Sequence, residues 1–161
     1  MRRARPGSNH RRWLAGLALL ALACATPPTD DEVEAELHRI AASVRPRGEL
    51  RYVMLNAGSP MDAWAQVTES TAEGKESSSQ PAQRLARAFE QAGRRRIAVV
   101  TGGPYASLNE RTLLDAFTHL RVQKLPGLTL VFASPKPPSD DLCDLIKRTG
   151  ATLVVRDMVL R

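Results

Sequence analysis

Short apolar runs alternate with amphipathic segments along the chain from residue 50 onward. Four runs rich in β-branched residues and bounded by turn residues predict strands, at residues 51–57, 97–101, 128–133 and 152–156. The three longer segments that separate these runs carry apolar positions at helical spacing. A strand, helix, strand order repeated in this way predicts a parallel sheet with right-handed crossovers. The predicted fold class is α/β, a three-layer domain with a four-stranded, mainly parallel sheet preceded by an amphipathic helix.

Capping residues mark where these three helices begin and end. The first is predicted at residues 81–92, with Pro81 near its start and Gly93 at its end. The second follows a capping box formed by Ser107 and Glu110, and the third begins at Ser139 and ends at Gly150.

A further amphipathic helix is predicted ahead of the first strand. Thr29 and Glu32 have the spacing of a capping box, and residues 45–48 (RPRG) end the pattern. One face of this helix is apolar and consists of Val33, Leu37, Ile40, Ala41 and Val44. Residues 58–80 contain a polar, low-complexity stretch, so they are predicted to form a long mobile loop after the first strand.

The N-terminus has the order of charges and apolar residues of a secretory signal. Arginines at positions 2, 3, 5, 11 and 12 precede a mostly apolar run over residues 13–25. A membrane-spanning helix needs about 20 apolar residues, so this run is too short to span comfortably. Pro27 and Pro28 prevent a helix from continuing beyond it.

The residues Leu20-Ala21-Leu22-Ala23-Cys24 resemble the lipobox of bacterial lipoproteins. The resemblance implies cleavage before Cys24, a diacylglycerol on its sulfur and an acyl chain such as palmitate on the new amino terminus. It departs from the commonest lipobox in having Ala21 three places before the cysteine. The implied organisation is a signal peptide at 1–23, a lipidated N-terminus and amphipathic helix at 24–48, and a Rossmann-like or flavodoxin-like α/β domain at 49–161.

Other interpretations of the leader remain open. It is also compatible with an ordinary secretory signal or an uncleaved anchor. Residues 11–14 (RRWL) resemble a twin-arginine export motif, so the sequence does not separate the two export routes. In each case we expect the domain on the exported side of a bacterial membrane, and the lipobox places it on the cell membrane or the outer membrane.

Removing the leader changes the meaning of the charge. Five of the 23 basic residues lie in the leader, which leaves 18 basic against 17 acidic residues. A nucleic-acid partner is therefore not expected, since binding to nucleic acid requires a persistent basic surface. Residues 94–96 (RRR) follow a predicted helix end, where cations complement the helix dipole.

Candidate binding residues lie where the predicted strands end, because ligands of open parallel sheets bind beyond the carboxyl ends of the strands. The small and polar residues at these ends are Ser59, Gly102, Gly103, Ser107 and Ser134. Gly102 and Gly103 precede a helix and so offer backbone donors to an anion such as a phosphate. The alternative is ordinary turn and cap chemistry, favoured by the acids at the helix starts. No complete phosphate-binding loop is present.

No catalytic or metal-binding set is evident in the sequence. A serine nucleophile would need a nearby base, and the only histidines after the leader, His38 and His119, fall inside predicted helices. No C-x-x-C motif or histidine pair indicates a metal, and no cofactor is predicted. With Cys24 acylated, Cys143 has no disulfide partner in the chain, and it is expected to be an inert or a reactive thiol.

Residues 84–117 are similar in layout to bacterial envelope α/β domains of the YdcF and SanA type. In both, a helix leads to a strand that ends in a glycine pair, and a helix bearing an acid follows. The resemblance implies a pocket near Gly102, Gly103 and Glu110. The later motif of those domains, an acid followed by threonine and asparagine, is absent from this sequence.

These observations predict a lipid-anchored protein of the cell envelope that acts as a non-catalytic binding or scaffolding module. Its expected partners are membrane lipid, through Cys24, and an unidentified envelope protein or small ligand. The alternative hypothesis is a small envelope enzyme, or a protein that binds a nucleotide or phosphate ligand, using the loops at the strand ends.

Overall fold

The computed structural model describes residues 26–72, 80–92, 94–121 and 123–160, with only the backbone for residues 68–72. The predicted signal peptide at 1–23, the lipidation site Cys24 and the helix-ending Gly93 lie outside the described residues.

The described residues contain five helices and four strands. In order they are α2 (Asp30–Val44), β1 (Glu49–Met54), α3 (Pro60–Ala72), α4 (Gln80–Ala92), β2 (Ile97–Gly102), α5 (Ala106–Thr118), β3 (Leu128–Ser134), α6 (Asp140–Thr149) and β4 (Thr152–Asp157).

The four strands form one sheet in the order β1-β2-β3-β4, and every neighbouring pair is parallel. The predicted three-layer α/β fold class is thus confirmed. Rossmann-like and flavodoxin-like sheets reverse their strand order at a switch point, and the reversal opens a crevice for ligands. This sheet keeps the order of the sequence and has no reversal among its described strands.

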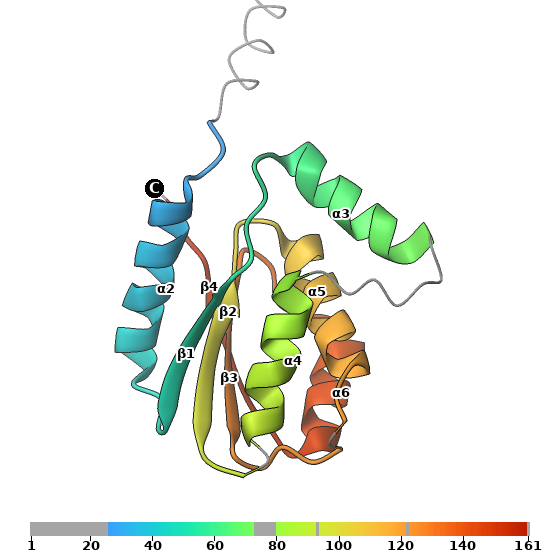
Figure 1. The fold of residues 1–161 in the computed structure, drawn as a ribbon. Helices are drawn as coiled ribbons and strands as arrows, with labels where there is room; N and C mark the ends of the chain where they lie inside the picture. Colours follow the sequence, from blue (N-terminus) through green and yellow to red (C-terminus); the bar gives the residue numbers. More distant parts are fainter. Residues whose placement is uncertain (1–25, 73–79, 93, 122, 161) are drawn as a thin grey trace, which may run out of the picture.

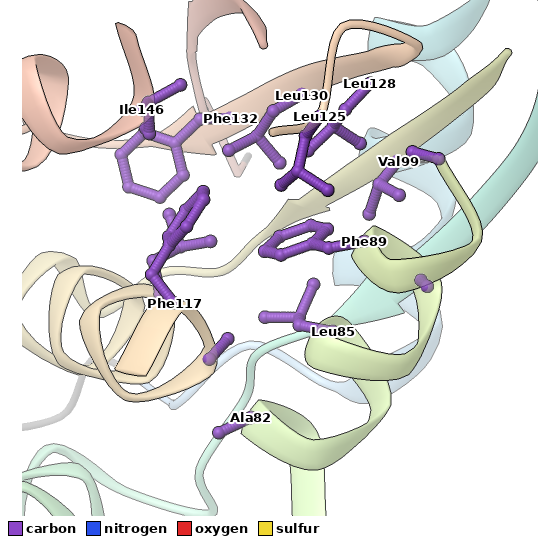
Figure 2. Packing of buried hydrophobic residues seen from close by; sticks show 14 of the residues in the cluster. Ala82, Leu85, Phe89, Val99, Phe117, Leu125, Leu128, Leu130, Phe132 and Ile146 are labelled. Atoms are coloured by element: carbon purple, nitrogen blue, oxygen red, sulfur yellow. The ribbon is translucent and has the colours of Figure 1, made fainter. Parts of the chain in front are cut away.

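Helices cover both faces of the sheet (Figure 1). On one face α4, α5 and α6 bury a core that includes Phe89, Val99, Phe117, Leu130 and Phe132, most of which Figure 2 shows in close packing. On the other face α2 is the one helix among the described residues, and it packs its apolar stripe against β2 and β3. Because α4, α5 and α6 each return the chain to the start of the next parallel strand, all four strands end where α2 begins and where α3 lies.

The start of α2 agrees with the predicted capping box. The hydroxyl of Thr29 accepts a hydrogen bond from the Glu32 N–H, and the Glu32 carboxylate accepts one from the Thr29 N–H at 2.8 Å. The bonds from the Thr29 backbone and hydroxyl lower the pKa of Glu32. The helix ends at Val44, where Arg45 adopts a left-handed conformation.

The prediction of a loop over residues 58–80 is wrong for most of its length. Residues Pro60–Ala72 form α3, and Gln80 begins α4. Ser59 caps α3 and Pro60 supplies a first residue whose fixed φ suits a helix. The polar, low-complexity residues 68–80 made the whole segment resemble a loop and so concealed the start of α3.

The predicted capping box at Ser107 is also wrong. Helix α5 begins at Ala106, two residues earlier than a cap at Ser107 would place it, and its N-cap is Tyr105, whose side chain makes no capping bond. Ser107 is exposed in the first turn, and Asn109 is fully buried. Leu108 and Asn109 face inward in the first turn of α5. Their burial requires the helix to begin before Ser107 rather than after it.

Candidate functional site

The carboxyl ends of the strands meet at one end of the molecule, beside the start of α2 and beneath α3 (Figure 1). The loops that follow β1, β2 and β3 bring Ser59, Gly103, Ser107 and Ser134 to this end. We call this region the strand-end loops.

The two glycines allow the backbone of neighbouring strands to approach closely. A Cβ on Gly102 would lie 1.8 Å from the carbonyl oxygen of Ala133, and one on Gly103 would lie 1.5 Å from that of Leu55. Gly102 also has a φ of +151°, which L side chains rarely adopt. Packing between β1, β2 and β3 therefore accounts for both glycines.

The amide of Gly103 is not directed at a ligand. Its N–H donates to the Ala133 carbonyl at 3.2 Å, and the Gly102 carbonyl accepts from the Leu55 N–H at 2.9 Å. An anion cradle of the kind considered from the sequence would need free donors at this turn. The geometry favours the alternative of turn and cap chemistry.

Asn109 of α5 links the end of β2 to the end of β3, a role that could not be assigned from the sequence. Its Nδ2 donates to the Gly103 carbonyl at 2.8 Å and to Ser134 Oγ at 3.3 Å. Ser134 itself is buried. A signal for the burial of Asn109 was present, since this residue lies at helical spacing with the inward-facing Thr112, Leu113 and Ala116.

Two buried polar atoms at this end have no hydrogen-bond partner among the described residues: Oδ1 of Asn109 and the hydroxyl of Tyr105. Buried polar atoms are normally satisfied, so each leaves a bond unmade. Tyr105 lies beside α3, whose Ala63 and Val67 pack with Leu108 and Tyr105. Helix α3 thus occupies part of the space in which a ligand of the strand-end loops would lie.

Ser59 acts as a helix cap. Its hydroxyl accepts from the Asp62 N–H at 3.1 Å and donates to the Asp62 carboxylate at 2.8 Å. Ser139 caps α6 in the same way, and its hydroxyl also donates to the Glu110 carboxylate. These hydroxyls and acids therefore stabilise helix starts, as the sequence suggested.

No match to a known protein was found. Family models, curated proteins and solved structures were compared with the chain, and none of them matches it. The interpretation of the site therefore depends on its own geometry.

Neither described histidine contacts one of the candidate serines. His38 lies 3.6 Å from the Glu34 carboxylate and packs its ring against Tyr52, while His119 ends α5 at the opposite end of the sheet. Within the described ranges, neither histidine hydrogen-bonds a serine, and no group of three His, Cys, Asp or Glu side chains could hold a metal. Cys143 is a half-buried free thiol.

Two hollows on the described surface are lined by other residues. One of about 560 Å³ separates α2 from Val159 and Leu160, and one of about 440 Å³ follows the free edge of β1 beside α4. None of the predicted site residues lines either of them. Among the described helices, none is both long enough and apolar enough to cross a membrane.

Proposed function

We propose that this chain is a lipid-anchored binding module of the bacterial envelope, tethered through Cys24, in which the α/β domain binds rather than catalyses. The observation that carries the proposal is where the chain enters the domain, at Pro28 and the start of α2. The side-chain amide of Asn56, just after β1, donates to the Asp30 carboxylate at 2.7 Å and to the Pro28 carbonyl at 3.4 Å. These bonds hold the start of α2 against the strand-end loops.

The link from the proposed lipid to the fixed backbone is short. Three residues lie between Cys24 and Pro28, so the link covers four residue-to-residue steps and spans at most about 14 Å at ~3.5 Å per step. A cysteine carrying acyl chains inserts them in the bilayer, since each buried methylene contributes about 0.8 kcal/mol. The strand-end loops and α3 would then face the membrane surface.

Helix α3 presents apolar side chains at this same end. Met61 and Trp64 are 72% and 64% exposed and lie one turn apart on α3. Tryptophan concentrates at membrane interfaces, where one end of its ring system is apolar and the other wet. Their exposure is consistent with a second contact between the domain and the headgroup region.

Charge favours a neutral membrane surface for this contact. The helix starts at this end carry Asp30, Asp31, Glu32 and Asp62. Carboxylates are repelled by anionic headgroups over about 8 Å at physiological salt. We therefore expect contact with zwitterionic lipids.

Replacing Cys24 with serine tests the anchor. We expect the native chain to sediment with membranes and to carry acyl chains by mass spectrometry. The C24S chain should be released or left with its leader, because the acylated sulfur is lost. An unmodified thiol in the mature native protein would contradict the anchor. Turnover of a metabolite that Ser59→Ala abolishes would contradict the non-catalytic part of the proposal.

Trp64 reports on the second contact. The sequence contains two tryptophans, and Trp13 lies in the leader, so Trp64 is the only one expected in the mature chain. We expect its fluorescence to shift to the blue when the acylated protein enters phosphatidylcholine vesicles, and brominated lipids to quench it. Met61→Asp should reduce both effects, while Leu50→Asp serves as a control at an exposed apolar position near the start of β1, at the opposite end of the strands. An emission spectrum unchanged by vesicles would show that α3 stays in water.

The alternative function, binding of a nucleotide or phosphate ligand at the strand-end loops, has one specific observation in its favour. The unpartnered Asn109 Oδ1 and Tyr105 hydroxyl would gain hydrogen bonds from a ligand. Against it, both atoms are covered, the Gly103 donor is occupied, and acids stand at the starts of α3 and α6. The geometry supports the binding module better.

A further inference from the structure

The outer edge of β1 is open in the part of the chain that the structure describes. β1 is the first strand of the sheet and pairs only with β2. An unpaired edge offers a row of backbone N–H and C=O groups that can pair with another extended chain. The hollow of about 440 Å³ follows this edge between β1 and α4.

Positive charge lines one side of the edge. Arg84 and Arg87 lie one turn apart on α4 and line the hollow with Arg51 of β1. Arg51 is already bound to Glu49 at 2.7 Å and lowers the pKa of that carboxyl. Arg84 and Arg87 are exposed and have no acidic partner among the described residues. Two uncompensated guanidinium groups therefore stand beside unpaired backbone.

The other side of the edge is apolar and aromatic. Leu50 and Tyr52 are 40% and 36% exposed, and the His38 ring lies 4.2 Å from that of Tyr52. Successive side chains of a strand point to opposite faces, so Arg51 and Val53 face α4 while Leu50 and Tyr52 face α2. A strand added to this edge would meet arginines on one face and an apolar surface on the other.

We propose that the β1 edge is the docking site for an extended peptide segment of a partner protein in which acidic residues alternate with apolar ones. The backbone of the segment would continue the sheet, as in other peptide recognition by added strands. Its carboxylates would pair with Arg84 and Arg87 in charge-assisted, bidentate hydrogen bonds. Its apolar side chains would pack on Leu50 and Tyr52.

A second copy of this chain fits the edge poorly. Its own β1 would bring another Arg51 toward Arg84 and Arg87, and the one acid of β1, Glu49, already pairs with Arg51 and Arg95. Like charges would therefore meet at the edge and destabilise the pairing. The charges thus select an acidic partner and oppose pairing of the edge with itself. The proposal is independent of whether Cys24 is acylated.

Fluorescence anisotropy with a labelled peptide of eight residues, alternating glutamate and valine, tests the proposal on the purified full chain. We expect saturable binding that weakens with salt. The double variant Arg84→Glu, Arg87→Glu should lose about tenfold or more in affinity, because two charge-assisted bonds are replaced by repulsion. The same variant should gain affinity for a lysine and valine peptide.

Two controls separate docking at the edge from general charge attraction. The variant Arg121→Glu, Arg148→Glu has the same change in charge at exposed arginines after α5 and on α6, away from β1, and should bind as the native chain does. A glutamate and valine peptide methylated at every backbone nitrogen should fail to bind, since neither of its edges can donate hydrogen bonds to a strand.

Equal loss in both double variants, or equal binding of the methylated peptide, would overturn the proposal. A complete absence of binding by the unmethylated peptide would also overturn it. Arg84 and Arg87 would then serve only to prevent the β1 edge from pairing with other chains. Melting temperatures equal to that of the native chain establish that the variants are folded.

Discussion

Replacing Gly103 with alanine should lower the free energy of unfolding by about 4 kcal/mol or more, among the largest effects of a single substitution. The added Cβ would lie 1.5 Å from the Leu55 carbonyl oxygen and 2.7 Å from its carbon. These are backbone atoms of the chain leaving β1, so they cannot rotate away as a flexible side chain would. The loop must move and lose the Gly103 N–H bond to Ala133 and the Asn109 bond to Gly103.

Gly150→Ala is the matched control. Gly150 ends α6 with a φ of +79°, yet no atom lies within 4 Å of its would-be Cβ. Its replacement should cost only the left-handed backbone strain, about 1–2 kcal/mol. Urea unfolding of both variants measures the difference. If Gly103→Ala were as stable as the native protein, the glycine would not be required by packing, and a ligand role would regain support.

Replacing Phe89 with alanine should lower the free energy of unfolding by about 3–5 kcal/mol. Phe89 is fully buried at the centre of the core formed by α4, α5, β2 and β3, and its ring lies 5.0 Å from that of Phe117 (Figure 2). Truncation loses the burial of the ring and leaves a cavity that close-packed neighbours cannot fill. For a domain of this size we expect a melting temperature lower by roughly 10–15 °C.

Val159→Ala is the control for Phe89. Val159 follows β4 and is 57% exposed, so its truncation should change stability by about 0.5 kcal/mol or less. Calorimetry of the two variants gives the comparison. A Phe89 variant that melts within a few degrees of the native chain would mean that α4 does not pack on the sheet as described.

Elements with strong local signals could be predicted from the sequence. Thr29 with Glu32 marked the start of α2, and Ser139 with Gly150 marked both ends of α6. The β-branched runs placed all four strands to within a few residues, because a buried parallel strand is apolar on both faces. Repetition of strand and helix then gave the parallel sheet.

Contacts between segments distant in the sequence could not be predicted in this way. The sequence suggested Gly102 and Gly103 as donors to a ligand, whereas their constraint comes from the carbonyls of Leu55 and Ala133. Asn109 had two local interpretations, a cap or a buried residue, and only the packing of α5 on the loops selects the second. Charge at the β1 edge was also hidden, because Arg51 and Arg84 approach one another only in the fold.

The order of the strands bears on how the protein is assembled. Since each strand is placed beside the one that precedes it in the chain, no strand has to be inserted between two that are already paired. The sheet can therefore be built progressively from β1 as the polypeptide emerges from a ribosome or an export channel, with each arriving unit covering the edge left by the last. The finished sheet keeps its first and its last strand at the two margins, so the pairs at its centre form without either end of the sheet being threaded between others.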